Sequence, residues 1–498
     1  MRKKLFCILA FLLTLCGTAL AKEAILSIDS NIVNYNGNEM SLEGQVLVRH
    51  IWGDLSSDYA LLQKSDKDKS DDFHFLKLMN NVHISMQNGG VFHCANAELN
   101  SRTWKGRFSG NAKGKKVRYH DEYLDENYIK RKIELESMYM DISILQKEDA
   151  YIIDKILAKE GVCMKQDNIF TVLADEALFQ NKNDFSPSSA KCKFPGELTL
   201  TPQKDNGICR VLHHENDFIE AGKIFIDGSR NILSCEKAEG KIHSYRMNYS
   251  SKYDIHFLTD SLVWEKNTGV LKMKDNVSIE QDDLGKIFVE DEITLWMEPL
   301  EKDNILREMQ SKGKTLLTYS DISRGYQHRL SSSGGIHINN LSLKMLLFSP
   351  MQDGSVVEGR QVVFQDDMGE VYGDAVLIDY DSIQGKIYPK KIYIMGNVKI
   401  VNHTISHEDS QENEWQYALA DEVEIFFPFQ EMTLFAREDK HVLFFDKVKN
   451  IQMSAKEIRF KRDGKTGEES VEGIGVVRFF FDLKEFESLK KTFHMSEE

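Results

Sequence analysis

The sequence predicts an all-β fold in which short strands repeat along the chain. Apolar and polar residues alternate in segments such as 277–279, 286–290, 391–401 and 422–425. This period of two, bounded by Gly, Asn and Asp, is typical of half-buried strands. Only seven of the 498 residues are proline, and no Pro/Ser/Thr-rich linker interrupts the pattern. We therefore expect one continuous stack of mostly antiparallel strands rather than separate globular domains.

Two segments depart from this alternation. Residues 300–312 and 482–491 are rich in Leu, Glu, Lys and Arg, which favour helices. These two segments are the helical candidates of a chain in which long helices are scarce.

The first 21 residues resemble a secretory signal peptide. Arg2, Lys3 and Lys4 precede an apolar run at 5–15, and small residues follow up to Ala21. The run is too short for a permanent membrane span, so we expect cleavage after Ala21 and export to the periplasm. The alternative is a lipoprotein signal with Cys16 as the lipidated residue, although Leu15 is large for the position before it.

The charge balance bears on partners. The leader holds three of the 63 Lys and Arg residues and none of the 78 Asp and Glu, so the remainder carries about −18. Such a surface repels nucleic acid, which we do not expect as a partner. Basic stretches at 113–118 and 130–132 are interpreted as solvated strand edges.

Five cysteines follow the leader: Cys94, Cys163, Cys192, Cys209 and Cys235. The odd number leaves at least one unpaired, and the absence of a C-x-x-C pair argues against a zinc ribbon. Disulfides joining Cys192 to Cys209 or Cys209 to Cys235, and buried free thiols, are the alternatives.

One short element recurs six times. Each copy has a turn residue, a Val, one further residue and an apolar residue, then a polar loop, and then a small or acidic residue before another strand. The Val residues are Val46, Val82, Val162, Val277, Val362 and Val398, and the later acid or amide residues are Asp58, Asn96, Asp175, Asp291, Asp374 and Asp421.

The spacing within the copies is nearly constant. The Val and the acid or amide residue lie 12, 14, 13, 14 and 12 residues apart in the first five copies, and 23 apart in the sixth, which has an insertion at 403–414. Each copy is a strand pair that cannot bury its inner face alone, whereas stacked copies can. Because the acids recur at equivalent positions, we interpret them as structural turn residues rather than as one active site.

The repeat resembles the OstA-like, or organic-solvent-tolerance, domain. The resemblance rests on Gly-x-Val-x-Val at 44–48, on Ala-Asp at 174–175 and 420–421, and on Gly-Asn-Val-x-Ile at 396–400. It is clearest over 28–99 and 356–427, more degenerate over 258–296, and poor over 100–159 and 180–250. The domain is found in the periplasmic lipopolysaccharide transport bridge and in the N-terminal part of the outer-membrane lipopolysaccharide assembly protein.

The resemblance implies twisted β-jelly rolls, open along one edge, whose apolar groove shelters lipopolysaccharide acyl chains. It also implies docking, by edge strands, to other OstA-like bridge proteins or outer-membrane assembly proteins, with self-association as an alternative. The candidate groove residues are Val46, Val48, Val82, Ile84, Val277, Ile279, Val362, Phe364, Val398 and Ile400.

The chain is longer than a single bridge domain, so we expect two OstA-like regions at 22–250 and 251–498. The expected function is periplasmic lipopolysaccharide binding and transport in outer-membrane biogenesis. The alternative is a structural β-solenoid, an envelope scaffold or adhesin without lipid cargo, in which the same apolar residues pack against one another.

We expect no enzyme, cofactor or metal site. The sequence has no Gly-x-Ser-x-Gly, His-Glu-x-x-His or P-loop motif. Clusters at 120–122 and 213–215 contain metal-ligand residue types, but adjacent residues of a strand point to opposite faces and chelate poorly.

Overall fold

The computed structural model describes residues 27–481 with internal gaps, the longest at 65–72, 182–195 and 405–413. The described residues form strands β1–β39, and their only helical turn is a 3-10 turn at Phe427–Phe429. The described strand pairings are antiparallel apart from one contact between β16 (Ile232–Tyr245) and β22 (Asn304–Lys312). The expected all-β fold is confirmed. The predicted leader and the predicted helix at 482–491 lie outside the described residues.

The predicted helix at 300–312 is wrong where the structure describes it, because Asn304–Lys312 form strand β22. This strand pairs with β21 (Glu292–Pro299) on one side and with β25 (Gly335–Asn339) on the other. Met309 is buried between Leu295 and Ile338. Helix propensity is worth only tenths of a kcal/mol per residue, so hydrogen bonds to two neighbours and burial of Met309 outweigh it.

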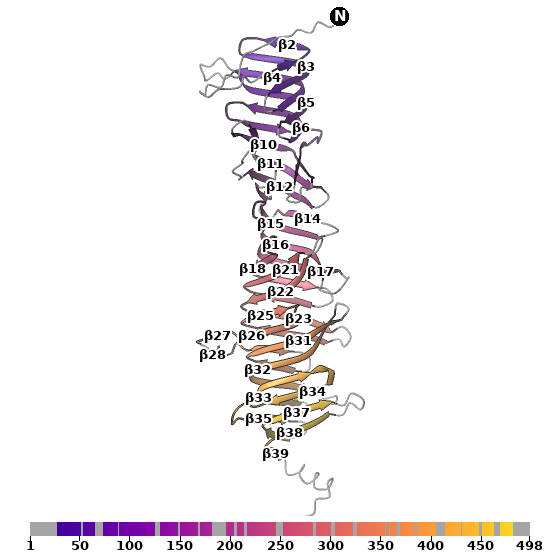
Figure 1. Ribbon diagram of the computed structural model, residues 1–498, viewed down its shortest axis with the longest axis vertical. Helices are drawn as coiled ribbons and strands as arrows, with labels where there is room; N and C mark the ends of the chain where they lie inside the picture. Colours follow the sequence, from indigo (N-terminus) through magenta and orange to yellow (C-terminus); the bar gives the residue numbers. More distant parts are fainter. Residues whose placement is uncertain are drawn as a thin grey trace, which may run out of the picture. The chain divides into compact units, whose positions relative to one another are not determined.

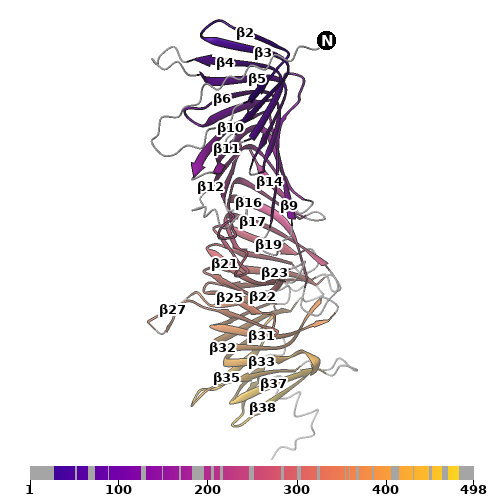
Figure 2. The same cartoon turned by 45° about the horizontal axis from the view of Figure 1, so that its top comes forward.

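The chain divides into two compact units. The N-terminal unit comprises residues 1–240 and 265–267, and the C-terminal unit comprises 241–264 and 268–498. Within each unit successive strands stack largely in chain order, as the labels from β3 to β6 and from β31 to β35 show (Figures 1 and 2). Each stack is therefore held by strands that are near neighbours in sequence.

The strands turn at corners made of two consecutive residues with positive φ. These pairs have φ values of 46° to 75°. They are Gly44-Gln45 in β3 (Glu39–His50), Asn80-Asn81 in β5 (Phe73–Met86), Glu160-Gly161 in β11 (Ala150–Gln166), Asp275-Asn276 between β18 (Val270–Lys274) and β19 (Val277–Gln281), and Gly396-Asn397 in β32 (Lys386–Thr404). Left-handed φ is most accessible to Gly and Asn, which explains why those residues precede the repeated Val.

The pairing register slips at the corners within strands. In β32, Met395 pairs with Glu422 while the next paired residue, Val398, faces Ala420. The same break separates Glu43 from Val46 in β3. The fifth copy differs, since Gln361 before Val362 is not among the residues with positive φ.

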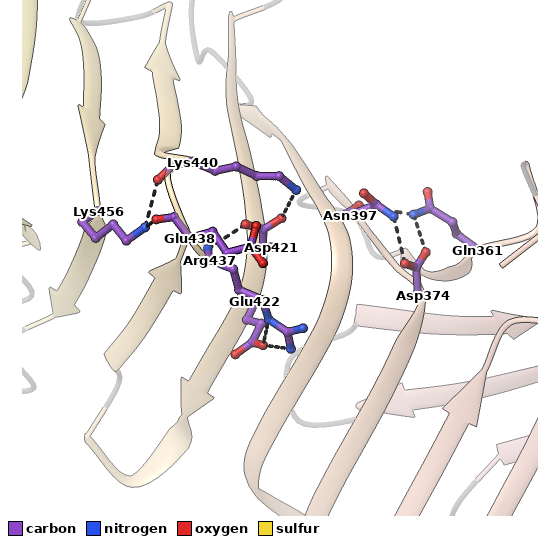
Figure 3. Close-up of polar contacts among 9 residues, drawn as sticks. All are labelled: Gln361, Asp374, Asn397, Asp421, Glu422, Arg437, Glu438, Lys440 and Lys456. Carbon is purple, nitrogen blue, oxygen red and sulfur yellow. Dashed lines mark hydrogen bonds and ion pairs between the residues drawn. The ribbon is translucent and has the colours of Figure 1, made fainter. Parts of the chain in front are cut away.

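Acids of the adjacent strand clamp these corners; Asp58 and Asp374 belong to the repeat, whereas Asp260 plays the same part outside the six copies. Asp374 Oδ2 accepts a hydrogen bond from Asn397 Nδ2 at 2.9 Å, and its Oδ1 accepts one from Gln361 Nε2 at 3.1 Å (Figure 3). The Asp374 amide also donates to the carbonyls of Met395 and Gly396. The amide of Asn81 donates to Asp58, and that of Asn276 donates to Asp260, each at 2.8 Å. These acids hold the corner of the adjacent strand.

The acid of the sixth copy is held by a backbone N–H and a lysine instead of a side-chain amide. Asp421 accepts hydrogen bonds from the backbone N–H of Arg437 at 2.7 Å and from Lys440 Nζ at 2.9 Å (Figure 3). The Arg437 guanidinium pairs with Glu422. These contacts hold the pKa of Asp421 below its usual range, chiefly through the hydrogen bond from the Arg437 amide. The recurring acid is therefore a structural turn residue, as the sequence interpretation proposed.

Each corner passes the chain from one half of the continuous hydrogen-bonded sheet to the other half, and we call these two halves sheet A and sheet B. In the C-terminal unit, sheet A contains β31 (Ala375–Ile383) and sheet B contains β30 (Gly369–Gly373), and the two halves of β32 pair with one each. In the N-terminal unit, sheet A contains β7 (Lys105–Ser109) and sheet B contains β8 (Val117–Leu124), both paired with β6 (Val91–Asn100).

Aromatic contacts show that the two sheets share one interior. Phe92 of sheet B lies 4.7 Å from Phe108 of sheet A between ring centroids, and Phe444 of sheet B lies 5.1 Å from Phe460 of sheet A. The residues beside the corners form unbroken buried ladders. In sheet A of the C-terminal unit the ladder is Ile336, Leu347, Val376, Ile394, Val423, Leu434 and Ile458, each opposite the next.

We predict that Gly396→Ala destabilises the chain more than Gly359→Ala. Both glycines have φ near +70°, so each Ala should cost about 1 kcal/mol in backbone strain. Only at Gly396 would the new Cβ meet a neighbour, Asp374 Oδ2, at 2.3 Å, whereas Gly359 has nothing within 4 Å. Urea unfolding should show a lower midpoint for Gly396→Ala, and equal midpoints would contradict the clamp.

Candidate functional site

Two inward-facing apolar rows of the C-terminal unit form the candidate site. Each row lies one inward position farther from the corners than the buried ladders. Row B, on sheet B, comprises Ile279, Ile287, Leu317, Leu330, Phe364, Val371, Ile400, Ala418, Phe444 and Met453. Row A, on sheet A, comprises Met345, Ile378, Ile392, Ile425, Met432 and Phe460. Every member lies opposite the next one in the strand register.

These rows are apolar yet incompletely covered. All six members of row A are half-buried, and so are seven members of row B; the exceptions are Leu330, Ala418 and Met453. The contact between Phe444 and Phe460 shows that the rows face each other at one place. Half-buried apolar side chains in register provide a long surface that an apolar ligand can cover.

The equivalent sheet B row of the N-terminal unit is closed at its start. It runs through Val48, Leu55, Ile84 and Phe92, each at most 5% exposed. Phe92 packs against Tyr119 at 4.6 Å between ring centroids. Farther along the same row, Tyr119, Val211 and Ile219 are half-buried. The facing row of sheet A is half-buried at Met40, Leu62, Leu76 and Leu99 and again at Phe179 and Ile226.

The ten residues predicted to line a groove fall into two groups. Seven are fully buried core residues: Val46, Val48, Val82, Ile84, Val277, Val362 and Val398. The Val of each copy directly follows its corner or turn residue, where the two sheets are closest, and it packs there. Ile279, Phe364 and Ile400 are half-buried and all belong to row B. Of the predicted set, these three residues are accessible to a ligand.

Row A was not among the predicted residues. Ile378, Ile392 and Ile425 lie on the other side of the corner from the Val-x-apolar element, in strands whose alternation was recognised without assigning it an inner face. A sequence signal for row A exists. Ile394 and Val398 lie four residues apart on either side of a corner, and both are buried. Counting back four residues from the repeated Val therefore gives an inward residue, and two residues further back gives the member of row A.

A polar chain borders row B on the side away from the corners. Asn402 donates to Gln416 at 3.2 Å, and Gln416 donates to Asp446 at 2.9 Å. Asn402, Gln416 and Asp446 each lie two residues from a member of row B, namely Ile400, Ala418 and Phe444 in that order, on the side away from the corner. The inner surface of sheet B thus changes from apolar to polar within one strand, which suits an amphipathic ligand.

The described cysteines Cys94, Cys163, Cys209 and Cys235 are free thiols, and Cys192 lies outside the described residues. Burial raises the pKa of Cys94 and Cys235 to about 12 and that of Cys209 to about 11. Cys163 is less buried. Cys94, Cys209 and Cys235 lie in the core as small apolar residues.

The described part of the chain contains no group of three or more His, Cys, Asp or Glu residues arranged to hold a metal ion. His214 and Glu215 of the sequence cluster at 213–215 lie outside it. No described helix is both long and apolar enough to span a membrane. Compared with known proteins, the chain matches no family model and no curated protein.

We predict that, of the four described cysteines, Cys163 reacts first with a thiol reagent at pH 8 in the native protein. Cys94, Cys209 and Cys235 should stay unmodified, because their raised pKa keeps the thiols protonated and burial blocks access. Peptide mass mapping after timed maleimide treatment resolves each site, and unfolding in urea should equalise them. Rapid native modification of Cys94 would contradict the packed interior.

Proposed function

We propose that the chain is an exported lipid carrier that holds lipopolysaccharide acyl chains between rows A and B of the C-terminal unit. The observation that carries the proposal is that both rows are apolar, in register and half-buried at all but three positions, whereas the sheet A ladder beside the corners is fully buried. The resemblance of the repeat to the OstA-like domain supports the choice of ligand. In this proposal the protein assists lipopolysaccharide transport to the outer membrane.

The physical chemistry of the rows suits acyl chains. Burying ten methylene groups contributes on the order of 8 kcal/mol before the costs of ordering the ligand. An acyl chain lying along the stack contacts one row member per strand and needs no hydrogen bonds. The polar chain from Asn402 to Asp446 could then face the polar part of the lipid.

The terminal strands support the proposed docking to other OstA-like proteins. Among the described pairings, β2 (Ile32–Tyr35) contacts β3 alone and β39 (Arg478–Phe481) contacts β36 (Ile451–Ala455) alone. β2 exposes Ile32, Val33 and Tyr35 by more than half, and β39 exposes Phe480 by 59%. An apolar strand with a free edge can be extended by a strand of a partner.

A structural scaffold remains the second candidate, and the N-terminal unit favours it. The closed row from Val48 to Phe92 is the packed interior that a scaffold without cargo requires. In this alternative, rows A and B would also close on each other in solution.

Photo-crosslinking in cells tests the proposal. A benzophenone amino acid at Ile400 or Ile392 should capture lipopolysaccharide, because both positions are inward and half-buried. The matched controls are Lys399 and Lys391, each one residue away on the opposite face of the same strand. Capture that is equal at all four positions, or confined to the lysines, would contradict the carrier and favour the scaffold.

A further inference from the structure

A pair of histidines lies on the outer face of sheet B in the N-terminal unit. His83 of β5 is directly opposite His93 of β6 in the strand register. Each lies between buried inward residues, His83 between Val82 and Ile84 and His93 between Phe92 and Cys94, so both rings point away from the interior. The pair is independent of the rows proposed to bind lipid.

The two rings approach each other through the same atom type. His83 Nδ1 and His93 Nδ1 are 3.2 Å apart, and the ring centroids are 4.6 Å apart. Two nitrogens bound to one ion at 2.0–2.1 Å lie about 2.8 to 3.4 Å apart, for square-planar and tetrahedral angles respectively. The observed separation falls within this interval, so little movement is needed to place an ion between them.

A third histidine holds one ring of the pair in place. Neutral imidazole carries a free lone pair on one nitrogen and is the form that binds metal ions. His120 of β8 stacks on His93 with ring centroids 5.6 Å apart and planes 15° apart, which fixes the ring orientation.

We propose that His83 and His93 together bind one divalent transition-metal ion of the kind that prefers imidazole, such as Cu²⁺, Ni²⁺ or Zn²⁺. Both Nδ1 atoms are ligands, both rings carry their proton on Nε2, and water completes the coordination. Binding shifts one proton between nitrogens of a single ring and releases none. The ion joins β5 to β6, the two strands that carry the second copy of the repeat.

Titration of the full chain with Cu²⁺, followed by electron paramagnetic resonance, tests the proposal. The wild type should bind one ion with superhyperfine splitting from two nitrogens. His83→Ala and His93→Ala should each weaken that binding by at least about tenfold, since even an outer-shell partner is worth that much. His74→Ala on the same strand should bind like the wild type. Unchanged affinity and splitting in both variants would overturn the proposal.

A second measurement uses the unaltered protein and so does not depend on the folding of a variant. Zn²⁺ should protect His83 and His93, but not His74, from carbethoxylation by diethylpyrocarbonate, as read by peptide mass mapping. Equal modification of all three histidines with and without Zn²⁺ would contradict the site. Far-UV circular dichroism confirms that each Ala variant keeps the wild-type strand content.

Discussion

The corner clamp is the contact on which the rest of the structure depends. Two consecutive left-handed residues turn a strand, and an acid or amide from the adjacent strand holds the turn, as Asp374 holds Gly396 and Asn397. Because the corner places both halves of a strand around one interior, every copy adds one rung to two facing sheets. Each clamp is exposed and individually weak, yet it recurs in both units, and the buried ladders beside it supply most of the stability.

An apolar row lies one position beyond the buried ladders of each sheet, and its burial varies along the chain. In the N-terminal unit, Phe92 reaches Phe108 across the interior and the row is fully buried from Val48 to Phe92. In the C-terminal unit, Val371 and Ile400 of row B are half-buried. The residue type at one position does not set this difference, because Ile84 and Ile400 occupy equivalent positions of the repeat. The same backbone plan therefore carries both a closed stretch of interior and an apolar surface that we propose to hold lipid.

Local sequence predicted the strands, the repeat and the structural role of the acids, since alternation and Gly/Asn turns are local properties. The burial of each inward side chain was not predictable, because it depends on the distance of the residue from the corner. Val398 is fully buried, whereas Ile400, two residues farther from the corner, is half-buried. Row A was missed because its inner face is set by the pairing across the corner. The helix predicted at 300–312 was overridden by pairing with β21 and β25. His83 and His93 are ten residues apart, and only the strand register brings them together.

In the proposed function, the C-terminal unit keeps an apolar interior open to acyl chains. Native mass spectrometry of the purified chain, with a double Ile400→Asp and Ile392→Asp variant as the control, tests this proposal. The wild type should give a species heavier than the polypeptide by the mass of a bound glycolipid, and the variant should lose that species. A wild-type mass equal to the polypeptide alone, even after incubation with lipopolysaccharide, would contradict it.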